Sequence, residues 1–137
     1  TGLMVNGNTA TYVAYVWTGI EGYSKFGAYE GNGEADGTVI YTGFKPAYVM
    51  IKKTSSTGNW VIYDSARSPY NEADDQLLAN EATAETTGSE EIDFLSNGFK
   101  IRTTDSDVNS AAGSYVYAAF AEYPFGGGED VTPATAF

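Results

Sequence analysis

Carboxylates are the most numerous side chains in this sequence that could carry out chemistry, with 18 Asp and Glu among 137 residues. Two carboxylates that flank a glycosidic bond can hydrolyse it, one as the acid and the other as the base or nucleophile. Because so many acidic residues form clusters by chance, we assign no catalytic residue. The clusters considered involve Asp64, Asp74, Asp75, Glu90, Glu91 and Asp93.

Nucleophilic catalysis is restricted by the absence of His and Cys from the chain. A nucleophile needs a base beside it, so Ser–His and Cys–His arrangements are excluded. A Ser–Lys pair stays open, although nothing in the sequence locates one. The glycine-rich stretches at 31–33 and 126–128 lack the Lys-Ser/Thr sequence of a phosphate-binding loop, and they predict a turn and a linker. We therefore expect the chain not to be an enzyme.

Three oxygen-bearing side chains at alternate positions, Asp105, Asp107 and Asn109, form the candidate metal site. Calcium prefers several oxygens that converge from loops. The glycine and the terminal Glu of an EF-hand loop are missing here, so an ordinary polar turn is the alternative interpretation. No other cofactor is expected.

The segment that follows a predicted strand at 60–63 is the candidate contact site. Asp64 and Arg67 can pair and pin this loop. Alternatively, the segment lies at a ligand or subunit contact, because aromatic and Arg side chains dominate contact hot spots. Exposed aromatic rings beside polar loops would also suit the faces of sugars. The contact residues that we predict are Trp60, Asp64, Arg67, Tyr70 and Asn71.

The formal net charge of −11, with seven basic residues, limits the partners of the chain. Nucleic acids and anionic membranes are bound through Lys and Arg, so we expect neither as a partner. The charge is interpreted as surface solvation, with an acidic cation-binding surface as the alternative. The absence of Cys excludes a disulfide framework, and no apolar run is long enough to span a bilayer.

The elements that position these residues are predicted to be short strands, because apolar runs rich in aromatic and β-branched residues are separated by turn sequences. Turns at 57–59 and 96–98 predict two hairpins, and a helical turn is predicted at 75–80. We expect an all-β, antiparallel, jelly-roll-like β-sandwich of about seven or eight strands with a flexible C-terminal tail. The predicted strands are 12–17, 26–29, 38–41, 47–52, 60–63, 92–95, 99–103 and 115–121.

An internal repeat divides the chain, because residues 5–17 align without a gap with residues 108–120. A chance match is the alternative. The repeat predicts that 1–22 is the closing strand of a preceding repeat or a strand-exchange segment, 23–125 the sandwich module, and 126–137 a Gly-rich linker and tail. The aligned pairs are Val5 with Val108, Asn6 with Asn109, Tyr12 with Tyr115, Val13 with Val116, and Trp17 with Phe120.

The strand at 12–17 is apolar on both of its sides, and a lone apolar strand is untenable in water. We expect it to pair with a sheet edge, of this domain or of another subunit. The strand-exchange residues are Tyr12, Val13, Tyr15 and Trp17.

Four blocks of the sequence resemble a domain family of unknown function that occurs in virion proteins of tailed phages, notably marine and cyanobacterial ones. The blocks are 43–52 (GFKPAYVMIK), 58–67 (GNWVIYDSAR), 93–102 (DFLSNGFKIR) and 115–122 (YVYAAFAE). Members often stand in tandem, beside concanavalin-like laminin-G modules, in long tail-fibre-like or structural proteins. The resemblance covers nearly all of 12–137, and it implies no catalytic or binding residues.

The resemblance implies a virion structural or surface module, such as a capsid decoration, tail or fibre component. Such a module would act through contacts with copies of itself or with other virion proteins, and we expect a homo-oligomer on the exposed, extracellular surface of the particle. The first alternative is a receptor-recognition tip that binds host-surface polysaccharide. A glycan depolymerase is the remote alternative.

Overall fold

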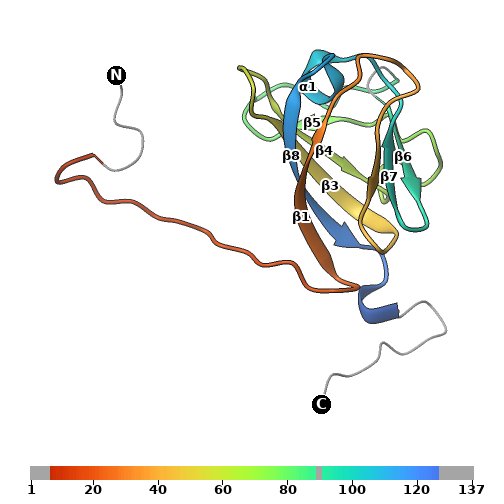
Figure 1. Ribbon diagram of the computed structural model, residues 1–137, viewed down its shortest axis with the longest axis horizontal. Coiled ribbons are helices and arrows are strands. Elements are labelled where there is room, and N and C mark those ends of the chain that lie inside the picture. Colours follow the sequence, from red (N-terminus) through yellow and green to blue (C-terminus); the bar gives the residue numbers. More distant parts are fainter. Residues whose placement is uncertain (1–6, 89–90, 127–137) are drawn as a thin grey trace.

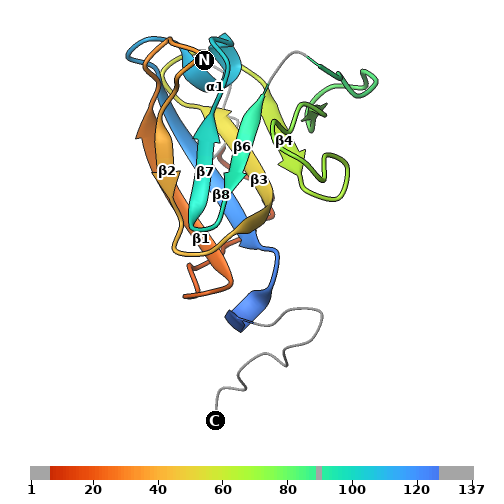
Figure 2. The same cartoon turned by 90° about the vertical axis from the view of Figure 1, so that its right-hand side faces the viewer.

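Eight β-strands form two antiparallel sheets in the computed structural model, which describes residues 7–88 and 91–126 (Figure 1). The larger sheet has the order β1 (Ser24–Glu30), β8 (Ser114–Ala121), β3 (Pro46–Lys53), β4 (Trp60–Asp64) and β5 (Leu77–Leu78). The smaller sheet has the order β2 (Val39–Tyr41), β7 (Gly98–Ile101) and β6 (Ile92–Leu95). Figure 2 shows the smaller sheet in front of the larger one, so the predicted β-sandwich is confirmed.

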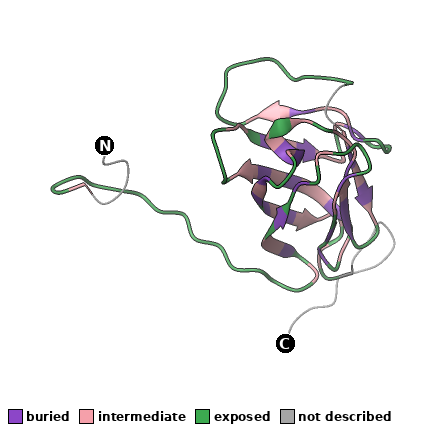
Figure 3. Ribbon diagram, turned by 45° about the horizontal axis from the view of Figure 1, so that its top comes forward, coloured by how far each residue is buried: buried purple, intermediate pink, exposed green. Residues whose placement is uncertain are grey.

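The core lies between the two sheets, because every second side chain of a strand points to the same side. Val49 and Ile51 of β3 are fully buried, and so are Phe99 and Ile101 of β7. Each such side chain stabilises the fold by about 1.5–3 kcal/mol through burial. Figure 3 shows that the buried residues lie mainly on the strands.

A single helical turn, α1 (Ser106–Asn109), packs against β3 and β4. The Asp105 carboxylate caps it by accepting a hydrogen bond from Asp107 N at 2.6 Å. The hydroxyl of Tyr115 in β8 donates to Ser106 O at 2.9 Å and accepts from Ser110 N at 2.7 Å. None of the helical segments in the described residues has the length and apolar character that a membrane crossing requires.

Most predicted strands are present with shifted ends, and the pairing of β3 with β4 and of β6 with β7 confirms both hairpins. The strand predicted at 99–103 ends at Ile101. The helical turn predicted at 75–80 is wrong, because Leu77 and Leu78 form β5 against β4. This pairing gives hydrogen-bond partners to the backbone of β4, which outweighs local helix preference.

The buried strand predicted at 12–17 is wrong for the isolated chain. Residues 7–19, which we call the arm, run away from the sandwich (Figure 1), and Val13 and Val16 are 78% and 87% exposed. A strand needs a neighbour for its backbone hydrogen bonds. In the described part of the chain, no strand pairs with the arm.

The arm leaves the sandwich from a fixed turn at 20–24. Ile20 N donates to Ser24 O at 3.0 Å, and Phe125 N donates to Gly22 O at 3.0 Å. Phe125 belongs to η1 (Pro124–Gly126), which therefore docks beside the base of the arm (Figure 1). The linker and tail predicted at 126–137 lie outside the described residues, apart from Gly126.

Gly98 provides a test of the contact between β2 and β7. A Cβ atom there would lie 2.0 Å from Ile40 O of β2, and neighbouring backbone cannot easily move away. We expect Gly98→Ala to lower the free energy of unfolding by roughly 1–3 kcal/mol in equilibrium denaturation. The control is Gly19→Ala, whose Cβ would make an ordinary contact of 3.5 Å with Ser24 O. Equal stability of the two variants would contradict the β2–β7 pairing described here.

Candidate functional site

The side of the larger sheet that faces away from the core is apolar, and we call it the outer face. In its central row, Ala118 of β8 lies between Phe26 of β1 and Met50 of β3. Ile62 of β4 lies beyond Met50. The alternation of the strands places these residues on the outer face: Ser24, Phe26, Ala28, Glu30, Tyr48, Met50, Lys52, Trp60, Ile62, Asp64, Leu77, Ser114, Val116, Ala118 and Phe120.

Phe120 is the centre of an aromatic cluster on the outer face. Its ring meets Phe26 and Tyr48 edge-on, with 5.9 Å between centroids in each pair. Tyr23 meets Phe120 in the same way at 6.0 Å. Trp17 of the arm stacks on Phe26 at 6.4 Å. Aromatic pairs contribute about 0.5–1.5 kcal/mol each beyond their buried area, so the arm is anchored to the outer face by one ring.

Two hollows extend across this surface, with volumes of about 350 and 480 Å³. Both are lined by Trp17, Phe26, Met50 and Ala118. The first continues towards Tyr48 and Phe120, and the second towards Trp60, Val116 and Tyr117. The hollows therefore follow the outer face from end to end, with the arm at one side.

The chemistry of the hollows favours an apolar contact over the binding of a polar ligand. Among the residues that line the first hollow, only Trp17 and Tyr48 carry a polar side-chain atom. A sugar brings many hydroxyl groups, and each one that loses water without gaining a hydrogen bond has a free-energy cost. An apolar protein surface has no such cost.

The five predicted contact residues are divided among different surfaces. Trp60 lies at the second hollow of the outer face. Tyr70 is 83% exposed and lines a separate small pocket with Asn71, whose side chain bonds to the backbone of Phe94. Asp64 and Arg67 bond to one another. A ligand role for these residues stays a prediction, since the structure does not gather them into one site.

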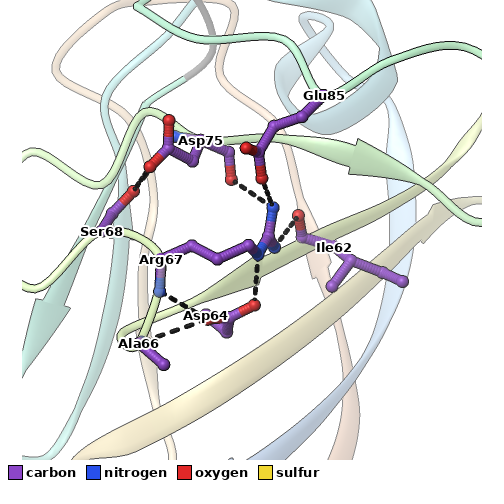
Figure 4. A network of polar contacts seen from close by, with 7 residues as sticks. All are labelled: Ile62, Asp64, Ala66, Arg67, Ser68, Asp75 and Glu85. Carbon is purple, nitrogen blue, oxygen red and sulfur yellow. Dashed lines mark hydrogen bonds and ion pairs between the residues drawn. The ribbon is translucent and has the colours of Figure 1, made fainter.

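Arg67 is the hub of a polar network that ties the loop after β4 to two other segments (Figure 4). Its Nε atom donates to Asp64 Oδ2 at 2.5 Å, which is the predicted pair. Its Nη1 atom bonds to Glu85 and to Asp75 O, and its Nη2 atom donates to Ile62 O at 3.4 Å. The guanidinium is thus already bonded on several sides, which fits a loop-pinning role.

The charge of Asp64 is stabilised within this network. Burial acts to raise the pKa of its carboxyl, but hydrogen bonds from the Arg67 guanidinium and from the N–H groups of Arg67 and Ala66 outweigh it and lower the pKa below 3.8. Burial likewise acts to lower the pKa of Arg67, and its bonds to Glu85 and Asp64 raise it. Both members of the pair therefore stay charged at neutral pH.

The side chains of the three candidate calcium ligands form hydrogen bonds with different partners. Asp105 caps α1, and Asp107 Oδ2 accepts from Asn59 Nδ2 at 2.8 Å. Asn109 is fully buried, and its Nδ2 atom donates to the backbone oxygens of Glu34 and Thr103, each at 2.8 Å. Among the residues that the structure describes, no group of three or more His, Cys, Asp or Glu is placed to hold a metal ion.

Sequence reasoning named Asn109 as a candidate metal ligand and as the repeat partner of Asn6, but not as the residue that holds the loop at 32–36 against α1. It missed Met50 altogether. Met50 is central to the outer face, and its signal was the unbroken apolar run of β3, since a strand that is apolar on both sides is typically covered on both sides.

The four predicted strand-exchange residues lie on the arm, where they are exposed. Tyr15 stacks on Trp17 at 6.2 Å, and Trp17 stacks on Phe26 of the sandwich at 6.4 Å. Their exchange role stays a prediction.

A family model, described as a domain of unknown function (DUF7483), matches residues 1–124. The match therefore includes the arm as well as the sandwich. No curated protein and no solved structure matches the chain.

Replacing Asp64 tests the Arg67 network. We expect Asp64→Asn to lower the free energy of unfolding by about 1 kcal/mol at neutral pH, because charge-assisted hydrogen bonds are lost at a partly exposed site. The folded-state pKa lies below 3.8, so the stabilisation is complete above pH 3.8 and is lost as the pH falls through the folded-state pKa. The difference between wild type and variant should therefore shrink in acid.

The control for this measurement is Glu30→Gln, which removes an exposed carboxylate of β1. In equilibrium denaturation at neutral pH, it should lower the free energy of unfolding by less than Asp64→Asn does. If the difference in free energy of unfolding between wild type and Asp64→Asn instead grew as the pH fell, the Arg67 network would be contradicted.

Proposed function

We propose that this chain, which belongs to the DUF7483 family of domains of unknown function, is a structural module that associates with copies of itself through its outer face. The observation that supports the proposal is the continuous apolar surface formed by the aromatic cluster around Phe120 and the row through Met50 and Ala118.

Exposure of this surface to water is unfavourable, and association would remove it from water. Apolar burial stabilises by about 25 cal/mol per Å². A sandwich sheet with one solvated side normally carries polar residues there. Here, β3 instead directs Tyr48 and Met50 outward, between the inward-pointing Val49 and Ile51. Contiguous apolar patches of this kind mark interaction sites.

The distribution of charge is compatible with contact between copies. Within the strands, the outer face carries charge only at strand ends, at Glu30, Lys52 and Asp64. The centre of an interface is typically depleted of charged residues. The net charge of −11 makes copies repel one another at long range, so association should strengthen as salt screens the repulsion.

A role in a phage particle, exposed on its surface, rests on the sequence resemblance. Subunit contact is the mode of action that such a component needs, and the apolar outer face supports this over glycan recognition. An enzymatic role has no comparable support, since we assign no catalytic residue to the chain.

Sedimentation velocity over a range of protein and salt concentrations tests the proposal. We expect concentration-dependent self-association of the wild-type chain that strengthens with salt. Met50→Lys should weaken it by about tenfold or more, because it places an unpaired charge in the contact.

The matched control is Val39→Lys, which replaces an exposed apolar side chain of β2 in the other sheet. It should associate as the wild type does, and circular dichroism should show that both variants are folded. A wild-type chain that stays monomeric at every concentration would refute the proposal.

A further inference from the structure

The arm repeats the segment that leads into β8 in its local structure as well as in its sequence. In the arm, Ala10 N donates to Gly7 O at 3.2 Å. At the aligned positions before β8, Gly113 N donates to Ser110 O at 2.9 Å. The same tight turn therefore precedes the strand sequence in both places.

A tyrosine closes each turn in the same way. In the arm, Gly7 N donates to the Tyr12 hydroxyl at 2.6 Å. Before β8, Ser110 N donates to the Tyr115 hydroxyl at 2.7 Å. Gly7 aligns with Ser110 and Tyr12 with Tyr115, so the bond recurs in register with the repeat.

The backbone conformation recurs as well. Thr9 has a φ of 64°, and Ala112, its aligned partner, has a φ of 54°. A positive φ is uncommon outside glycine, and only one further non-glycine residue in the described ranges has one. Turn, tyrosine bond and backbone angle together indicate that the arm and the segment at 110–120 are two copies of one structural unit.

In the sandwich, this unit supplies the central strand of the larger sheet. β8 pairs with β1 on one side and with β3 on the other. Tyr115, Tyr117 and Ala119 point into the core, and the residues between them point to the outer face. The aligned arm residues are apolar or aromatic on both sides, with Tyr12, Ala14 and Val16 on the core side and Val13, Tyr15 and Trp17 on the outer side.

We infer that residues 12–17 are the central strand of a second module of this architecture, inserted between that module's counterparts of β1 and β3. An edge strand leaves one row of its backbone hydrogen-bonding groups to water, and part of its side-chain surface is usually polar. Residues 12–17 are instead apolar or aromatic on both faces, as β8 is in the centre of its sheet. The equivalent position in the arm's own sandwich is filled by β8, so the acceptor is a separate module.

This inference rests on the proposed function, because the partner is again a module of the same kind. It specifies that the two modules are joined by insertion of residues 12–17 into the larger sheet of the second module. Trp17 aligns with Phe120, and both rings contact Phe26. The inserted strand would therefore place Trp17 at the outer faces of both modules. The turn at 20–24 would hold the two modules close to one another.

The inference is tested with an extended polypeptide in which a second copy of residues 23–109 is joined to the N-terminal side of residues 7–137. At the junction, Gly7 follows Asn109, as its aligned partner Ser110 does in the natural sequence. Backbone amide exchange at 12–17 is measured by NMR in this extended polypeptide and in the original chain. We expect protection to increase by about 100-fold or more on extension, at consecutive residues. In an antiparallel sheet, successive residues bond to opposite neighbours, so an edge strand would show protection only at alternate residues.

The matched control inserts one Ser between Thr11 and Tyr12 of the extended polypeptide. A shift of one residue exchanges the two faces of the strand, so we expect the protection to be lost. Because Ala14 takes the place of the larger Tyr117, a second variant, Ala14→Tyr in the extended polypeptide, restores that ring and should increase protection.

The outcomes separate this inference from the proposed function. Protection at alternate residues, or none in either the extended polypeptide or its Ala14→Tyr variant, would overturn the inference. Self-association of the original chain through the outer face would still stand in that case. If the extended polypeptide is monomeric and its amides at consecutive residues of 12–17 are protected from exchange, strand insertion is supported. That result would not depend on whether the outer face associates.

Discussion

The structure depends on the backbone pairing of β8 with β1 on one side and β3 on the other. This strand carries apolar side chains on both of its faces, with Tyr115, Tyr117 and Ala119 in the core and Val116, Ala118 and Phe120 on the outer face. Its first residues also organise one end of the sandwich, because Tyr115 stacks on Tyr29 at 5.0 Å and bonds to the ends of α1. Loss of β8 would separate β1 from β3 and remove the centre of the larger sheet.

The apolar outer face follows from the same strand. Ala118 is small enough to leave hollows between its neighbours, and Phe120 packs edge-on against the rings of Phe26 and Tyr48. The polar groups of the molecule are used elsewhere. Arg67 and Asn109 bind loops to the sandwich through several hydrogen bonds each, and the candidate metal ligands cap or support α1. The described structure therefore presents an apolar surface suited to contact, while the pair of Asp64 and Arg67 holds the loop after β4.

Sequence reasoning predicted much of the fold because its signals are local. The period of two identified the strands, and the turns at 57–59 and 96–98 identified both hairpins. It failed at β5, where pairing with β4 outweighed the helical preference of residues 75–80. It also did not combine Trp60 with Met50 and Phe26, because three different strands bring them to one surface and only the sheet order decides which strands are neighbours.

The sequence by itself determined the all-β class, the alternation that separates core from surface, and the repeat that relates the arm to residues 108–120. The tertiary structure alone decided that β8 is central, that Arg67 reaches Glu85, and that the arm pairs with no strand in the described part of the chain. The physical reason is that alternation and turn propensity act between near neighbours in the chain. The order of strands is set by hydrogen bonds and packing between residues far apart in it.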